Sequence, residues 1–123
     1  MNAEQSIRQG YVAALIDLYL RLPETPLHPA AADYLTARDF QHRNVSLDLL
    51  EAALLLGSLR RLLRPADLLP LPPIRSLAYF RPVIEELLVQ PLPPHYLDYL
   101  RLKLLQISTP RPNAQKNTFP DAR

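Results

Sequence analysis

The sequence predicts an all-α protein, a single-domain bundle of about five helices with proline-rich connectors, and three observations favour this fold. Leu and Ala are abundant while Val, Ile and Thr are sparse, which favours helix over strand. Only two glycines accompany fourteen prolines, so the positive-φ turns on which β-hairpins depend are scarce. The prolines lie between leucine-rich blocks, and a proline begins or ends a helix because it lacks an N–H and clashes with the preceding turn.

The chain of 123 residues has the length of one domain. We expect a helical domain over residues 1–107 and a disordered tail over residues 108–123, where breakers are frequent and no helical period appears. The sequence has no cysteine, which fits a reducing compartment, and it shows neither a targeting segment nor an apolar run of about 20 residues that could cross a membrane. These features predict a cytoplasmic protein.

Two helices are expected before residue 43. The first, Gln5–Leu22, ends at Pro23 and carries apolar strips on two nearly opposite sides, so it needs cover on both. The second is expected to begin at Pro29 and to end near His42.

The clearest helix is expected over Leu47–Arg64, with Ser46 as its N-cap and basic residues in its last turn, where the helix dipole favours cations. Ala53 and Gly57 lie four residues apart on this helix and would allow another helix to approach closely. Both close packing inside the chain and a homodimer seam are open interpretations.

A connector, Pro65–Pro73, follows this helix, and its leucines are expected to lie along the helices. Ser76 is expected to cap a short helical turn that carries Tyr79 and Phe80 as buried anchors. Pro82 lies beyond the first turn of a helix that starts after Ser76, and a proline at such a position breaks or kinks a helix. We therefore predict a break near Phe80–Arg81. A last helix is expected to start at Pro93 and Pro94.

The connector also contains a recognition pattern. In "PLPPIR", Pro70, Pro73 and Arg75 match Pro-x-x-Pro-x-Arg, which is typical of ligands that dock as a preformed polyproline helix on aromatic grooves. The segment is therefore either displayed to a partner or serves as a joint between two helices. The neighbouring leucines favour the joint.

Charge is divided along the chain. Residues 1–59 hold four arginines and seven acids, a net charge of −3, and residues 60–107 hold seven bases and four acids, a net charge of +3. These seven bases are the candidate contacts to a phosphate or to an acidic partner, because arginine binds both with two parallel hydrogen bonds. They are Arg60, Arg61, Arg64, Arg75, Arg81, Arg101 and Lys103. The simpler interpretation is dipole compensation for the first three and ordinary solvation for the others.

Residues that would carry catalysis are missing from the pattern. The three histidines are scattered without metal-ligand spacing, and Glu85 and Glu86 are adjacent, so on a helix they diverge by about 100°. There is no glycine-rich phosphate loop and no nucleophile elbow. We therefore expect no enzyme, no cofactor, no metal site and no small-molecule substrate.

The segments "VSLDLLEAALLLGSLRR" and "PIRSLAYFRPVIEELL" have a residue pattern similar to that of a known helical segment. Residues 44–105 resemble a part of phage and plasmid replication-initiation proteins and, more distantly, DnaD-type primosome domains. The match is carried by Ser76, Tyr79, Phe80, Pro82, Ile84, Glu85 and Glu86. The resemblance implies a role beside replication or a mobile element, with the two aromatic residues packed inside. No winged-helix domain precedes the segment, and its net charge is not strongly basic.

The functional prediction is a non-catalytic helical protein-interaction module, an adaptor or accessory subunit that binds a protein partner or a second copy of itself. The alternative is a nucleic-acid-associated replication or mobile-element accessory protein that uses the arginine-rich face.

Overall fold

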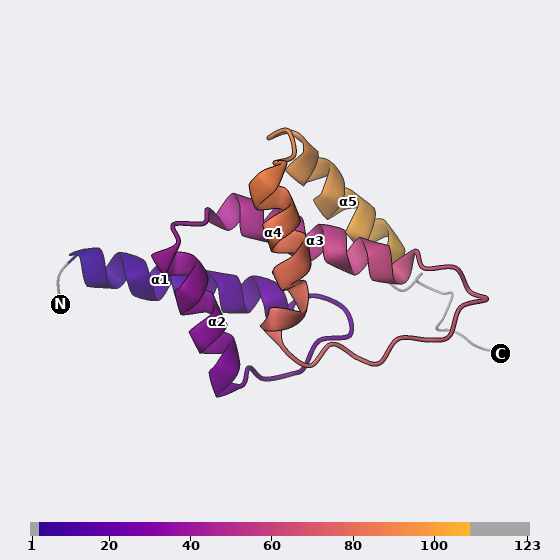
Figure 1. Ribbon diagram of the computed structural model, residues 1–123, viewed down its shortest axis with the longest axis horizontal. Helices are drawn as coiled ribbons and strands as arrows, with labels where there is room; N and C mark the ends of the chain where they lie inside the picture. The colour runs from indigo at the N-terminus through magenta and orange to yellow at the C-terminus, as the bar shows by residue number, and fades with distance from the viewer. Residues whose placement is uncertain (1–2, 109–123) are drawn as a thin grey trace.

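The computed structural model describes residues 3–108, and in this range the protein is all-α, as predicted (Figure 1). It has five α-helices and one short 3-10 helix, with no strand in the described range. The elements are α1 (Ala3–Leu20), α2 (Ala31–His42), α3 (Leu47–Leu62), η1 (Leu77–Phe80), α4 (Arg81–Val89) and α5 (Tyr96–Ser108). Apart from Ser108, which ends α5, the predicted disordered tail lies outside the described residues.

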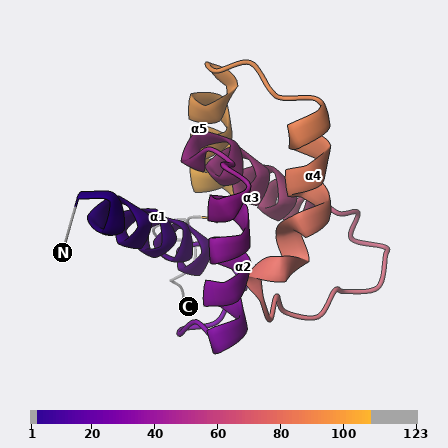
Figure 2. The same ribbon diagram turned by 60° about the vertical axis from the view of Figure 1, so that its left-hand side comes forward.

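Helix α3 is the centre of the bundle and packs against α1, α4 and α5. In Figure 1, α5 lies above α3, α4 crosses in front of α3, and α1 lies below α3 with α2 in front of it. Helix α2 packs against both α1 and η1, so it connects the N-terminal helix to the segment that precedes α4 (Figure 2). No helix among the described residues is both long and apolar enough to cross a membrane.

The core is built mainly from leucine, with a few aromatic rings. The buried leucine and isoleucine side chains include Leu15, Leu50, Leu54, Leu59, Ile84, Leu100 and Leu104. Leu18 and Leu97 pack against this cluster and are partly buried. Phe40, Phe80 and Tyr19 are completely buried among them and supply the largest contact areas.

Several helix ends differ from the predicted ones, among them the start of α5, which lies at Tyr96 rather than at Pro93 or Pro94. Helix α1 ends at Leu20 rather than at Leu22, and α3 ends at Leu62 rather than at Arg64. Helix α2 begins at Ala31, because the carboxylate of Asp33 accepts the backbone N–H of Ala30 (2.9 Å) and makes Ala30 the N-cap. The predicted cap of α3 is confirmed, since Ser46 Oγ accepts the N–H of Leu49 (3.1 Å).

The predicted break near Phe80–Arg81 is confirmed, because the 3-10 helix η1 ends at Phe80 and α4 begins at Arg81 with Pro82 in its first turn. The prediction that the Ser76 side chain caps η1 was wrong. Ser76 holds the N-cap position without a side-chain hydrogen bond, and Asp33 Oδ1 instead accepts the N–H of Leu77 (2.9 Å). Of the two expected anchors Phe80 is buried, whereas Tyr79 is 42% exposed.

Candidate functional site: the connector surface

The predicted connector extends two residues further than expected, and from here on the name connector is used for residues 65–75, which lie between α3 and η1. In Figures 1 and 2 this segment leaves the tip of α3, loops out from the body of the bundle and returns to η1. It contains no helix or strand, and prolines fix much of its backbone in an extended form.

The expectation that the connector leucines lie along the helices was wrong. Leu69 is 84% exposed, and Leu68 and Leu71 are 46% and 39% exposed. The neighbouring prolines restrict the backbone to extended conformations, which disfavours close packing of these side chains on α3. Because α1, α4 and α5 already pack on α3, few apolar positions remain for them to cover.

Arg61 holds the connector to the body. Its side chain is only 6% exposed, and Nη2 donates to the carbonyl oxygen of Pro72 (2.7 Å) and to the carboxylate of Glu24. Nη1 donates to the hydroxyl of Tyr79 (3.2 Å), and the guanidinium lies over the Tyr79 ring. One buried arginine therefore joins α3, the turn after α1, the connector and η1.

Glu24 supplies a second attachment. Its backbone carbonyl accepts the N–H of Ile74 (3.0 Å). Glu24 has a φ of 67°, in the left-handed region that is unfavourable for a residue with a β-carbon. A strained backbone at a contact point is found where the surrounding structure fixes the residue, and here Arg61 and Ile74 do so.

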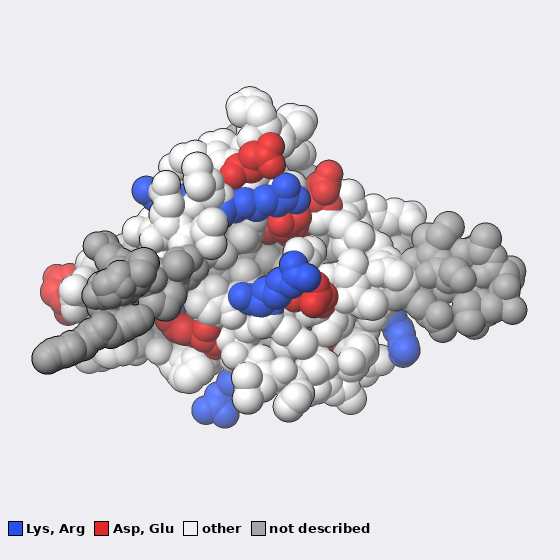
Figure 3. Space-filling view, turned by 180° about the vertical axis from the view of Figure 1, so that it is seen from behind, with Lys and Arg blue, Asp and Glu red and all other residues white. Residues whose placement is uncertain are grey.

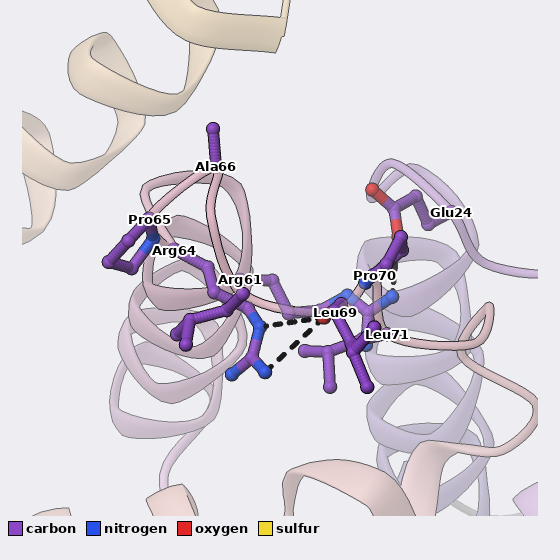
Figure 4. Close-up of a pocket in the computed structure, with 9 residues that line it drawn as sticks. Glu24, Arg61, Arg64, Pro65, Ala66, Leu69, Pro70 and Leu71 are labelled. Atoms are coloured by element: carbon purple, nitrogen blue, oxygen red, sulfur yellow. Dashed lines mark hydrogen bonds and ion pairs between the residues drawn. The ribbon is translucent and has the colours of Figure 1, made fainter.

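Arg64 makes the third attachment and lies between two hollows. Its Nε and Nη2 donate to the carbonyl oxygen of Leu69 at 3.4 and 3.3 Å, as the dashed lines in Figure 4 show. The first hollow, of about 280 Å³, is the one drawn in that figure, and the second has about 370 Å³. Both hollows are lined by Arg61, Arg64 and Leu71, so they adjoin beneath the connector.

Four of the seven candidate bases form ion pairs with carboxylates of the same chain. Arg60 binds Glu86 through two hydrogen bonds, and Arg101 binds Glu51 in the same way. Arg81 binds Asp39, as Arg61 binds Glu24.

The other three bases have no ion pair among the described residues: Arg64 contacts only a carbonyl, and Arg75 and Lys103 lie on different elements. On the face drawn in Figure 3, the basic side chains are scattered among acidic ones.

The division of charge along the sequence is largely balanced within the fold. The pairs Glu24–Arg61, Asp39–Arg81 and Glu51–Arg101 each join an acid of the first half to an arginine of the second half. The separation of charge therefore connects elements of one chain, and it does not leave two oppositely charged faces for a partner.

Ala53 and Gly57 lie on a tightly packed face of α3. Ala53 is fully buried. A β-carbon at Gly57 would lie 2.8 Å from Cδ1 and 3.0 Å from Cε1 of Phe80, and 3.5 Å from Cγ2 of Val83. The close approach at Gly57 is therefore made by η1 and α4 of the same chain.

Glu85 and Glu86 diverge on α4, as expected for adjacent helical residues. Glu85 makes two hydrogen bonds with Arg43, and Glu86 makes two with Arg60. The hydrogen bond from the arginine lowers the pKa of each carboxyl below its usual value. Both groups act as clamps that tie α4 to its neighbours.

Asp33 is a structural residue that sequence reasoning missed. Its carboxylate is buried and accepts two backbone N–H groups, those of Ala30 and Leu77, so it caps α2 and η1 together. An acidic residue three positions after the N-cap is a recognisable capping signal, which could have been read from the sequence. The link to η1 carries no such signal. Burial, and then the charge of Asp33, raises the pKa of nearby Tyr19 to about 12.

The fold and the site define a helical bundle that carries a proline-rich segment on its surface. Among the described residues, no group of three or more His, Asp or Glu side chains is placed to hold a metal ion. A scan against protein-family models, a search of curated proteins and a search of solved structures each find no match. The resemblance to replication-initiation proteins therefore stays a prediction.

Proposed function

We propose that this protein is a non-catalytic protein-interaction module, an adaptor or accessory subunit that docks a partner on the connector. The observation that supports this most is the arrangement of the connector itself. Arg61, Arg64 and Glu24 bind its backbone at three points, while Leu68, Leu69 and the prolines of the connector are exposed. Fixing an apolar segment in water stabilises the fold little, so a binding role is the better explanation.

Four exposed apolar side chains lie at this site. Leu68, Leu69, Leu71 and Tyr79 are all exposed, and Leu71 and Tyr79 line the same hollow. Neighbouring apolar side chains on a surface are typical of interaction sites, whereas single ones are common everywhere.

Affinity capture with paired variants tests the proposal. The full chain is immobilised and the proteins retained from its source cells are compared with those retained by Leu69→Asp, which places a charge on the connector. Leu35→Asp is the matched control, because Leu35 is a similarly exposed leucine on α2. We expect a protein that the wild type and Leu35→Asp retain and Leu69→Asp loses. Equal retention by all three would refute the connector as the docking site.

Self-association is the second form of the proposal. The outward side of α5 carries three exposed apolar residues, Tyr99, Leu102 and Leu105, at intervals of three. Light scattering on the purified chain over a range of concentrations tests this form. A strictly monomeric protein would remove self-association and leave the connector proposal intact.

The nucleic-acid alternative has less support, because carboxylates of the same chain bind four of its seven candidate residues: Arg60, Arg61, Arg81 and Arg101. It rests on Arg64, Arg75 and Lys103. Phosphate contacts would give an affinity for DNA that falls steeply with salt concentration. A DNA-binding titration that detects nothing at low salt would remove this alternative.

A further inference from the structure

Within residues 69–75, Ile74 is buried, and Leu71, three residues before it, is less exposed than Leu69. Ile74 is 3% exposed and Leu71 39% exposed, whereas Leu69 is 84% exposed. The other side chains of the segment, Pro70, Pro72, Pro73 and Arg75, are all exposed.

A polyproline helix has three residues per turn, so residues three apart share one edge. Leu71 and Ile74 thus share one edge, on which Ile74 is buried while Leu71 lines the second hollow and stays partly exposed. The two remaining edges face solvent, one with Leu69, Pro72 and Arg75 and the other with Pro70 and Pro73.

The backbone of this segment is restricted to the extended conformation that such a helix requires. Proline fixes its own φ near −65° and disfavours the helical region for the residue before it, so residues 69–73 are all restricted. Between residues 70 and 73 only Leu71 has a backbone N–H, which prevents the segment from joining a sheet. The contacts at Leu69, Pro72 and Ile74 hold both ends in place.

Arg75 ends the outward edge and has no ion pair or side-chain hydrogen bond among the described residues. In this respect it differs from the arginines that carboxylates of the chain bind, such as Arg60 and Arg101. An exposed, unpaired guanidinium next to an apolar ridge is complementary to a groove that has an acidic residue at its end.

We infer that residues 69–75 are a preformed polyproline-type ligand, recognised by a partner domain with an aromatic-lined groove and a carboxylate that binds Arg75. The outward proline edges enter the groove, and the inward edge of Leu71 and Ile74 anchors the ligand to its own protein. This inference rests on the proposed function and specifies the chemistry of the partner. It also reconciles the two interpretations of "PLPPIR", because the same segment is both a joint and a displayed ligand.

The test uses fluorescence anisotropy of the labelled full chain against a panel of purified polyproline-binding domains of the SH3, WW and EVH1 types. We expect binding by domains whose groove carries acidic residues. Pro73→Ala and Arg75→Gln should each weaken that binding at least about ten-fold. The first removes a proline from the edge that enters the groove, and the second removes a charge-assisted hydrogen bond. Both positions are exposed, so unchanged melting temperatures should show that the variants fold.

Arg38→Gln is the matched control, because Arg38 is an exposed arginine on α2 without an ion pair among the described residues. It should leave the affinity unchanged. A synthetic peptide of residues 66–76 is a second control. It should bind more weakly than the full chain, because the free peptide must lose conformational freedom that the folded protein has already lost.

Three results would overturn the inference: no binding to any domain of the panel, equal binding by wild type and Arg75→Gln, or equal affinities of the peptide and the full chain. If the panel fails while the paired capture experiment still separates Leu69→Asp from Leu35→Asp, the interaction module stands and only the polyproline chemistry falls. If both fail, the proposed function falls as well.

Discussion

Asp33 shows how one side chain can link elements that are distant in the sequence. Its two oxygens accept the N–H groups of Ala30, at the start of α2, and of Leu77, at the start of η1. The hydrogen bond to Leu77 is buried and the one to Ala30 is partly buried, and an unpaired N–H costs more in a buried place than in water. The relative position of α2 and η1 therefore depends on this residue.

We predict that Asp33→Ala lowers the free energy of unfolding by about 2–4 kcal/mol, because it leaves two N–H groups without a partner. Asp17→Ala is the control, since Asp17 forms an exposed pair with Arg21 on α1 and should cost less than about 0.5 kcal/mol. Urea denaturation of both variants measures the difference. Similar losses in the two variants would contradict the role assigned to Asp33.

Gly57 has no side chain because the Phe80 ring lies against it, whereas its helical backbone conformation does not need a glycine. We predict that Gly57→Ala destabilises the protein by about 1–2 kcal/mol, because overpacking against the buried Phe80 ring outweighs the better helix propensity of alanine. Gly10→Ala is the matched control. Nothing lies within 4 Å of its β-carbon, so this change in α1 should stabilise by about 0.5–1 kcal/mol. Thermal unfolding that shows a gain at both positions would contradict the tight contact at Gly57.

At the scale of single residues, the sequence predicted most of the side chains that form the core, but it did not predict for every residue whether the side chain points into the core or into solvent. Phe80 and Tyr79 are adjacent and similar in size, and only Phe80 is buried. The polar end of Tyr79 binds Arg61 from another element, and such a partner cannot be found by local periodicity. The capping role of Asp33 toward η1 was missed for the same reason.

Helix α4 is the element most dependent on ion pairs. It is only nine residues long, too short to be stable alone, and so its position depends on packing and on its clamps. Glu85 ties it to Arg43 after α2, and Glu86 ties it to Arg60 on α3. Both pairs are exposed, which makes them sensitive to pH and to salt.

These clamps predict a pH dependence of stability. The pKa of Glu85 and that of Glu86 are lowered in the folded state, so the unfolded chain binds protons more readily. The stabilisation is present above the usual Glu pKa of about 4.3 and is lost as the pH falls through the lower values of the folded state. Urea midpoints between neutral and acidic pH should fall less steeply in a Glu85→Gln, Glu86→Gln double variant. Identical slopes in the variant and the wild type would contradict the clamps.

Proline positions predicted the order of the elements, and leucine periodicity predicted the central helix. Helix ends were predicted less well. The start of α2 is set by the side chain of Asp33 and not by Pro29, and Pro29 lies before the helix. The start of α3 was predicted correctly because its cap, Ser46, is local.

For the whole molecule, composition predicted the all-α fold correctly but could not predict how charges pair. The seven candidate bases come from α3 and the turn after it, the connector, α4 and α5, and only the folded chain shows which of them lie beside a carboxylate. The connector was predicted as a joint whose leucines are covered. Its exposure depends on how completely the other helices occupy α3, which is a property of the packed bundle.

The central claim is that the bundle holds the connector in one extended conformation on its surface. Backbone 15N relaxation tests this most directly at the amides of Leu69, Leu71, Ile74 and Arg75. We predict order parameters of about 0.85, equal to those of α3. Values below about 0.6 at these amides would show a flexible loop and would contradict the claim.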